Sequence, residues 1–213
     1  KAYQSSTMYA DMAAELNALR VKGHIEKYMS TSKALSYFLL SFDALNENAR
    51  RNNYMKMLRT VLVKNTDLLS TWTIWEPNAL DGMDSMYVNV LGSTYLGNFS
   101  PTYFRDNDSI RLEGLSSGPL YQGSYYTIPK ERQEQVLLEP YYYSYLGNKD
   151  KEIIQTNMIV PLMQYGDFLG VVGVDVSVAD LQDFAEQIKP FDNSYAFLIA
   201  SNGTIVAHHN DGL

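Results

Sequence analysis

The chain has 213 residues, 46% of them hydrophobic, so it can bury the core of one domain, or of one domain and part of another. Its 24 acidic and 17 basic residues give a net charge of -7, which argues against nucleic acid and against an anionic membrane surface as partners. The absence of cysteine excludes disulfides, thiolate nucleophiles and zinc sites built on cysteine.

The two ends of the sequence lack the patterns of a natural boundary. The first residues, KAYQSSTMYADMAAEL, carry no signal-peptide pattern, and the last, VAHHNDGL, follow directly on a predicted hairpin. No run of apolar residues approaches the ~18 that a membrane span needs. We therefore expect the sequence to be an excised piece of a longer protein.

The first third of the chain is predicted to be helical. It has no proline before Pro77 and a single glycine, Gly23, and its apolar residues recur at spacings of three and four. The stripe consists of Met8, Met12, Leu16, Leu19, Ile25, Met29, Leu35 and Leu39. We expect one long helix over residues 7–45 and a second over residues 48–64, with Tyr54, Leu58 and Val61 facing inward.

From residue 68 onward the apolar residues alternate, which is typical of strands. Strands are predicted for LLSTWTIW (68–75) and MYVNVLG (86–92), and residues 153–178 predict a hairpin that turns at Tyr165-Gly166-Asp167. A helix capped by Ser177 and ended by Pro190 should follow. Asn202-Gly203 then predicts the turn of a second hairpin.

Residues 92–145 form a segment rich in glycine, serine, proline and tyrosine. It is too long for a bare loop inside a compact domain, and loops of this length are typical of lids and binding loops. Tyrosine suits a ligand wall, although packing of irregular backbone explains the same composition equally well. Together the elements predict an α+β fold, an antiparallel sheet with long helices on one side.

The three histidines do not form a catalytic or metal site in the sequence. His24 belongs to the predicted long helix with no partner motif beside it, and His208 and His209 are adjacent on a strand, so they point to opposite faces. The motifs of a nucleophile elbow, a zinc protease and a phosphate loop are missing. We expect no catalytic residue, no metal and no cofactor.

The stretch TWTIWEPNALDGMD (71–84) is a candidate for binding rather than for catalysis. Glu76, Asp81 and Asp84 could do acid–base chemistry, but Asp81 belongs to an Asp-Gly turn and no second chemical group accompanies them. Carboxylates beside the indoles of Trp72 and Trp75 suit a cationic or amide-bearing ligand. Because neighbouring strand residues alternate, one indole should share the face of Glu76 while the other lies in the core.

Asp175 lies within the apolar strand GVVGVDVS. A buried carboxylate is costly unless it is paired or hydrogen-bonded. Asp175 is therefore either a site residue or a group that binds the amides at the start of the following helix.

The order of these segments resembles the double Cache sensor domain of bacterial chemoreceptors (methyl-accepting chemotaxis proteins) and of some sensor histidine kinases. The resemblance rests on WTIWEPNALDGMD, on SYYTIPKERQEQVLLEPYYY, on GDFLGVVGVDVSVADLQDF and on SYAFLIASNGTIVAHH, after a long helix. It implies an extracytoplasmic (periplasmic) domain between two transmembrane helices, with two PAS-like modules on one long helix. It also implies a small-molecule ligand in the membrane-distal module, no enzyme activity, and a homodimer in the full-length receptor.

The resemblance implies a division of the chain into a helical region (1–66), a membrane-distal module (67–189) and the beginning of a membrane-proximal module (190–213). In the amino-acid-binding branch an arginine precedes an aromatic pair and an aspartate follows it, with a tyrosine and an aspartate further on. Tyr125-Tyr126 match the pair, Tyr141 or Tyr142 the later tyrosine, and Asp175 the last aspartate, which meets the ligand's amino group.

Two departures from that pattern concern the ligand. Gly123 occupies the arginine position and Ile128 the first aspartate position, so the bidentate clamp for an α-carboxylate is missing. An amine is therefore the first expectation and a purine-like ring the second, while an amino acid remains open if a loop cation replaces the arginine. The candidates for that cation are Arg105, Arg111, Lys130 and Arg132.

We expect residues 75–84 and the Tyr125-Tyr126 pair to form one pocket with Asp175 as its floor. The candidate ligand-binding residues are Trp72, Trp75, Glu76, Asp81, Asp84, Tyr125, Tyr126, Tyr141, Tyr142 and Asp175. The alternative function is a hydrolase or lyase that uses the carboxylate cluster.

Overall fold

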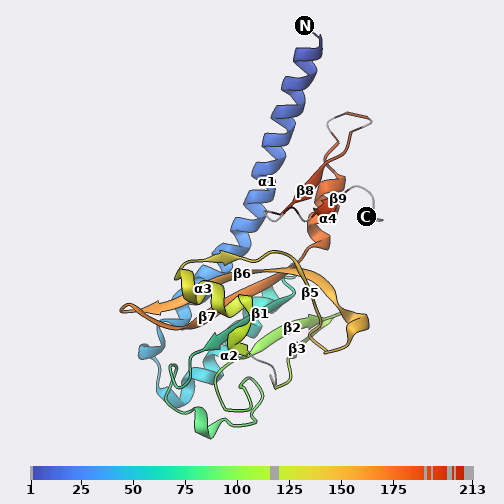
Figure 1. Ribbon diagram of the computed structural model, residues 1–213. Helices are drawn as coiled ribbons and strands as arrows, with labels where there is room; N and C mark the ends of the chain where they lie inside the picture. Colours follow the sequence, from blue (N-terminus) through green and yellow to red (C-terminus); the bar gives the residue numbers. More distant parts are fainter. Residues whose placement is uncertain are drawn as a thin grey trace.

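The computed structural model describes residues 2–115, 120–189, 191–192, 194–200, 203 and 205–208. Long helices pack against one face of a seven-stranded antiparallel sheet, which confirms the predicted α+β fold (Figure 1). Over the residues described, no helix has both the length and the apolar character needed to cross a membrane.

The N-terminal helix α1 spans Ala2–Leu39, which confirms a single long helix. It ends six residues before the predicted 45, because the Tyr54 hydroxyl donates to the carbonyl of Leu39 (2.8 Å) and the chain turns there into the short 3-10 helix η1, Phe42–Ala44. Figure 1 shows the N-terminal half of α1 standing away from the sheet. This half is therefore a stalk, and the C-terminal half belongs to the core.

Helix α2, Glu47–Lys64, runs back along the sheet close to the predicted bounds. The side chain of Asn46 accepts from the backbone N–H of Asn48 (3.0 Å) and caps the helix. Tyr54 and Leu58 are buried as predicted, and Leu62 rather than Val61 is the third buried apolar residue of this helix.

The sheet has the order β3-β2-β1-β7-β6-β4, and β5 also pairs with β6. The strands are β1 (Ser70–Trp75), β2 (Thr102–Asp106), β3 (Ser109–Leu112), β4 (Val136–Leu137), β5 (Tyr141–Tyr143), β6 (Ile153–Gln164) and β7 (Asp167–Ser177). The predicted hairpin is confirmed as β6–β7, and its turn residues Tyr165 and Gly166 have φ of 52° and 94°. Positive φ at both positions is the signature of a type I′ turn.

The strand predicted at residues 86–92 is wrong. This segment consists of turns after the short 3-10 helix η2, Asp84–Met86, and Asn89 and Gly92 have φ of 59° and 84°. Left-handed backbone at two positions is incompatible with a regular strand. The alternating apolar residues here, Met86, Val88 and Val90, are all exposed instead of facing a core.

The long tyrosine-rich segment is more ordered than its composition indicated. It contains β2 to β5, the helix α3 (Ser124–Arg132) and the 3-10 helix η3 (Leu120–Gln122), and a further 3-10 helix, η4 (Lys149–Lys151), follows it. The aromatic pair Tyr125-Tyr126 is therefore carried by a helix.

The C-terminal part follows the predicted order. Ser177 Oγ accepts from the N–H of Ala179 (3.1 Å) at the start of α4, Ala179–Glu186. Strands β8 (Phe197–Ile199) and β9 (Ile205–His208) pair with each other and not with the larger sheet, as expected. Three predictions concern residues outside the described part of the chain: Pro190 as a helix end, Asn202 as a turn residue, and His209.

The two faces of the sheet belong to two hydrophobic cores. On the side of α1 and α2 the core contains Trp75, Met158, Leu162, Val172 and Val174. On the side of α3 it contains Trp72, Ile74, Tyr126, Ile159 and Val171. Strand alternation thus separates the two tryptophans, as predicted.

Candidate functional site

A cavity of about 510 Å³ lies on the α3 side of the sheet, between the central strands and the tyrosine-rich segment. Its polar and aromatic lining is Trp72, Ser100, Thr102, Glu113, Tyr125, Tyr141, Tyr143, Ser144, Tyr145, Gln155, Asn157 and Asp175. Concave pockets with a few converging polar groups are the usual form of small-molecule sites. Four of the predicted site residues, Trp72, Tyr125, Tyr141 and Asp175, are brought together here.

Asp175 lies at the base of this cavity and is 2% exposed. Trp72 Nε1 donates to Asp175 Oδ1 (2.7 Å), the Tyr145 hydroxyl to Oδ2 (2.6 Å), and Ser70 Oγ and Asn157 Nδ2 also donate to the carboxylate. Ser70 and Asn157 are the register partners of Asp175 on the two flanking strands. The sheet itself therefore places these donors.

The surroundings of Asp175 bear on its two predicted roles. Burial raises the pKa of Asp175, and the hydrogen bonds from Ser70, Tyr145, Trp72 and Asn157 act in the opposite direction. The cap of α4 is supplied by Ser177 and not by Asp175. Asp175 is thus a buried carboxylate that lines the cavity and is held by a network of donors, and its role in binding a ligand stays a prediction.

A second carboxylate, Glu113, lines the same cavity and was missed by the sequence analysis. The hydroxyl of Tyr143 donates to Glu113 Oε1 (2.7 Å). Burial raises the pKa of Glu113, and the negative charge of Asp175 raises it further. Glu113 follows an edge strand and belongs to no motif, so no signal in the sequence distinguishes it.

The tyrosines of β5 and of the residues after it form one wall of the cavity. The rings of Tyr143 and Tyr145 meet edge to face with centroids 4.9 Å apart, and Tyr141 accepts from Gln155 Nε2 (3.1 Å). Tyr142 points to the other side of the strand and is 67% exposed. Of the two tyrosines that could match the later family tyrosine, Tyr141 is therefore the one at the cavity.

Two buried side-chain oxygens of the cavity wall, Ser100 Oγ and Asn157 Oδ1, have no hydrogen-bond partner among the residues that the structure describes. Ser100 Oγ can donate or accept, whereas Asn157 Oδ1 can only accept. Such an orphaned acceptor costs free energy unless a ligand or water donates to it. No lysine, arginine or histidine is among the described residues that line this cavity. The wall therefore favours a positively charged hydrogen-bond donor.

Glu76 and Tyr126 lie together, but outside the lining of the cavity. The hydroxyl of Tyr126 donates to Glu76 Oε1 (2.5 Å), and Lys130 of α3 forms an ion pair with the same oxygen. Tyr126 belongs to α3 and is fully buried. These contacts fasten α3, which carries Tyr125, to the end of β1.

Asp81 and Asp84 lie elsewhere. Arg51 of α2 binds both, with Nε 2.7 Å from Asp81 Oδ2 and Nη2 2.5 Å from Asp84 Oδ1. Its Nη1 donates to the carbonyl of Gly97 (2.7 Å), so the cluster holds the loop between β1 and β2. Burial alone would raise the pKa of Asp81, but the hydrogen bond and charge of Arg51 lower it.

The expectation that residues 75–84 line this cavity together with Tyr125-Tyr126 is therefore wrong, because none of residues 75–84 is among its lining and only Tyr125 of the pair is. Trp75 is excluded by strand alternation, which places it in the core on the α1 side. Asp81 and Asp84 are excluded because Arg51, distant in the sequence, draws them into a buried ion cluster.

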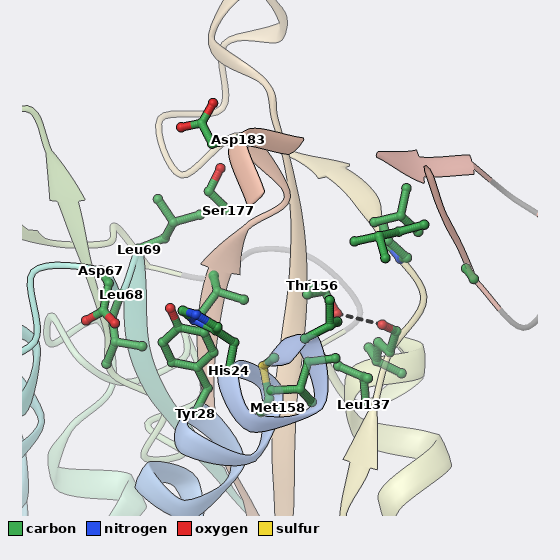
Figure 2. A pocket seen from close by; sticks show the side chains of 18 of the residues that line it. His24, Tyr28, Asp67, Leu68, Leu69, Leu137, Thr156, Met158, Ser177 and Asp183 are labelled. Atoms are coloured by element: carbon green, nitrogen blue, oxygen red, sulfur yellow. Dashed lines mark hydrogen bonds between the residues drawn. The ribbon is translucent and has the colours of Figure 1, made fainter. Parts of the chain in front are cut away.

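A larger cavity of about 910 Å³ lies between α1, the ends of β6 and β7, and the β8–β9 hairpin. Figure 2 shows His24 and Tyr28 of α1 inside it, with Asp67 and Asp183 toward its rim. Apart from a hydrogen bond of Thr156 Oγ1 to the carbonyl of Leu138 (2.6 Å), most of its lining is apolar. We place the candidate site in the smaller cavity, because of these two cavities it is the one whose described lining includes converging buried polar groups.

Comparison with known proteins was made on sequence and on structure. Residues 54–183 match the family described as methyl-accepting chemotaxis protein-like, first PDC sensor domain. The methyl-accepting chemotaxis protein TlpQ of Pseudomonas aeruginosa is 29% identical over 206 residues. That alignment covers 86% of this chain and 28% of TlpQ, so the chain spans little more than a quarter of that relative's length.

Solved structures share the architecture. The extracellular domain mmHK1S-Z3, assigned to a histidine kinase, has a TM-score of 0.78 at 28% identity, over 98% of this chain and 70% of that one. The ligand-binding domain of the amino acid chemoreceptor PctC of P. aeruginosa, in complex with GABA, has a TM-score of 0.64 at 18% identity, over 94% and 73%. The predicted combination of a long N-terminal helix with a PAS-like antiparallel sheet is thereby confirmed.

Proposed function

Because this chain belongs to the family of methyl-accepting chemotaxis protein-like PDC sensor domains, we propose that it binds an organic amine in the cavity above Asp175. Domains of this family sense small molecules and are not enzymes, which leaves the alternative of a carboxylate-dependent hydrolase or lyase without support. The identity of the ligand is the open question.

The charge of the cavity is the observation that carries the proposal. Asp175 and Glu113 both face the cavity, and no basic side chain is among its described lining. A protonated amine would neutralise Asp175 and could donate to the unpartnered Oδ1 of Asn157. Charge-assisted hydrogen bonds of this kind contribute about 1.5–3 kcal/mol each. The indole of Trp72 and the ring of Tyr125 would flank the alkyl part of the ligand.

An amino acid fits less well than an amine. The PctC domain was solved with GABA, which carries a carboxylate beside its amine. Of the loop cations that could bind a carboxylate here, Arg105 donates to the carbonyl of Leu62 (2.8 Å), Arg111 pairs with Asp106, and Lys130 pairs with Glu76. A carboxylate in this cavity would face Glu113 without a cation. A neutral purine-like ring remains the second candidate, because the walls are aromatic and Asn157 offers an acceptor.

A calorimetric titration of three probes tests the proposal. Butylamine and GABA differ by one carboxylate, and adenine represents the neutral ring. We expect butylamine to bind more tightly than GABA by at least about tenfold, since one uncompensated buried charge costs more than 1.4 kcal/mol. Asp175→Asn should abolish butylamine binding. Tyr142→Phe is the matched control, because Tyr142 lies on the opposite side of β5 and should leave affinity unchanged.

The outcome separates the ligand classes. Tighter binding of GABA than of butylamine would contradict the amine proposal and favour an amino acid. Binding of adenine alone would favour the second candidate. Retention of full butylamine affinity in Asp175→Asn would place the amine elsewhere.

We further propose that the ligand-binding module corresponds to residues 67–189, with residues 1–66 as its helical support and residues 190–213 as the beginning of a membrane-proximal module. The separate pairing of β8 with β9 supports this division. An extracytoplasmic location accords with the extracellular domains among the solved relatives. A chain that ends at residue 189 should bind the same probe with the same affinity, and loss of binding would contradict the division.

A further inference from the structure

Asp175 has no acceptor site left for a ligand as long as its four neighbours all donate to it. A carboxylate offers about four lone-pair sites, two on each oxygen. Trp72 Nε1 and Asn157 Nδ2 donate to Oδ1. Ser70 Oγ and the Tyr145 hydroxyl donate to Oδ2. A ligand that bonds directly to Asp175 must therefore displace one of these donors.

Three of the four donors are held by the sheet. Ser70 and Trp72 lie on β1, Asn157 lies on β6, and all three are buried. Tyr145 follows β5, which pairs with β6 only as far as Tyr143, so its backbone belongs to a turn instead of a strand. Its side chain lines the cavity and is half-buried. Tyr145 is therefore the donor that a ligand can both reach and displace.

The Tyr145 hydroxyl has a second acceptor within reach. Its oxygen lies 2.6 Å from Asp175 Oδ2 and 2.7 Å from Gln155 Oε1. A phenol carries one proton, so only one of these two oxygens can receive it at a time. Burial raises the pKa of Tyr145, and the charge of Asp175 raises it further, so the hydroxyl keeps that proton. Turning the hydroxyl from Asp175 to Gln155 exchanges one hydrogen bond for another.

The ring of Tyr145 is held independently of its hydroxyl. It stacks on Phe104 of β2, with centroids 4.9 Å apart and an interplanar angle of 6°, and it meets Tyr143 edge to face. Tyr145→Phe should keep both ring contacts and remove only the hydroxyl. The variant therefore isolates the hydrogen bond from the packing of the cavity wall.

We propose that the Tyr145 hydroxyl occupies the acceptor site of Asp175 that faces the cavity, as an internal substitute for the ligand, and that an amine binds by driving this hydroxyl to Gln155. A protonated amine can do so because both partners of its bond to Asp175 are charged, whereas the phenol is neutral. The bond from Tyr145 keeps the buried carboxylate satisfied while the cavity holds no amine. The inference rests on the proposed function, because it concerns how the same cavity admits its ligand.

Calorimetric titration of Tyr145→Phe with butylamine tests the displacement. In the wild type the amine must break a hydrogen bond to a charged group, and Gln155 returns only a bond between neutral groups, whereas the variant has neither. We therefore expect Tyr145→Phe to bind butylamine about fivefold more tightly than the wild type, a difference of about 1 kcal/mol. Unchanged or weaker binding would mean that the amine does not displace the hydroxyl, and would overturn the inference.

Ser70→Ala is the matched comparison, because it removes a hydroxyl donor from the same oxygen of Asp175. Ser70 is fully buried and is not among the described residues that line the cavity, so the acceptor site that it vacates is out of reach of the ligand. Ser70→Ala should therefore not raise the affinity. An equal rise in both variants would mean that any loosening around Asp175 favours the amine, and would contradict a particular role for Tyr145.

A titration without ligand separates this inference from the amine proposal. Burial raises the pKa of Asp175, and the bond from Tyr145 opposes this by stabilising the charged form. The pKa of Asp175, followed by carbon NMR of its carboxyl group, should therefore be higher in Tyr145→Phe than in the wild type. An equal pKa would mean that Tyr145 already donates to Gln155, and the inference would fail whatever the cavity binds. If the pKa rises but neither protein binds an amine, the amine proposal fails and with it the displacement, while the occupancy of Asp175 by Tyr145 stands.

Discussion

At the scale of single residues, the protonation of Glu113 in the cavity should make the stability of the folded protein depend on pH. Its pKa is raised in the folded protein, mainly by burial. An acid with a raised folded pKa contributes stability that is fully present below its unfolded pKa and is lost as pH rises through the folded pKa. We therefore expect Glu113→Gln to be more stable than the wild type at pH 7.5 and equally stable at pH 4.

Thermal unfolding of the two ligand-free proteins across this pH range checks the expectation. Only the difference between them is informative, because Asp81, whose pKa is lowered, affects both proteins in the opposite sense. A constant difference at all pH values would mean that Glu113 stays in one protonation state throughout.

Arg51 is the residue with the largest expected effect on folding. Its guanidinium is buried and binds Asp81 and Asp84, so Arg51→Met would leave two buried carboxylates without a cation. Loss of one partner of a buried pair costs about 3–5 kcal/mol. Arg111→Met is the control, since its ion pair with Asp106 is half-exposed and should contribute less than about 1 kcal/mol. Urea unfolding of both variants gives the comparison, and equal losses would refute a special role for Arg51.

At the scale of elements, a glycine of β7 shapes the cavity floor. A Cβ at Gly173 would lie 2.4 Å from Cζ2 of Trp72, whose indole donates to Asp175. We expect Gly173→Ala to displace the indole and to weaken butylamine binding by about tenfold or more, the value of one hydrogen bond to a charged group. Gly114→Ala is the control at the same cavity, because a Cβ there meets nothing within 4 Å. Calorimetric titration of both variants should separate them.

Most of the helices and strands that bury a regular apolar face could be predicted from the sequence. Local periodicity was sufficient for α1, α2, β1 and the β6–β7 hairpin, because each buries a regular face and ends at residues with turn chemistry. Periodicity failed at residues 86–92, where the apolar residues alternate but the backbone forms left-handed turns, and where Arg51 of α2 binds Asp84 and Ser93 on either side of the segment. Tertiary contacts of this kind leave no trace in a local pattern.

Some residues of the candidate site could be identified from the sequence and others could not. Asp175 was identifiable because a carboxylate in an apolar strand requires partners, and Trp72 because alternation placed it on one face. Glu113, Tyr143 and Tyr145 were not identifiable individually, since they follow from how the tyrosine-rich segment folds over the sheet. The sequence predicted that this segment would be a lid or binding loop. It did not predict which of its side chains would face the cavity.

At the scale of the whole molecule, the cavity and α1 lie on opposite faces of one sheet. A signal from the ligand to the stalk must therefore pass through the sheet. Neighbouring residues of β6 offer a short route, because Asn157 faces the cavity and Met158 packs in the core on the α1 side. The carbonyl of Met158 accepts from Ser32 Oγ of α1 (2.7 Å), and Ser32 is fully buried.

We predict that this contact couples ligand binding to the stability of α1. In the wild type, the probe that binds the cavity should slow amide hydrogen exchange in residues 28–39, because fixing Asn157 also fixes the strand to which α1 is bonded. Ser32→Ala removes the bond at a cost of about 1 kcal/mol and should reduce this protection while leaving ligand affinity nearly unchanged. Thr31→Ala is the matched control, since Thr31 is only half-buried and its hydroxyl bonds only within the helix, to the carbonyl of Lys27 (3.2 Å), among the contacts described. If exchange in α1 is insensitive to the probe in the wild type, or if Ser32→Ala and Thr31→Ala behave alike, the route through β6 does not carry the signal.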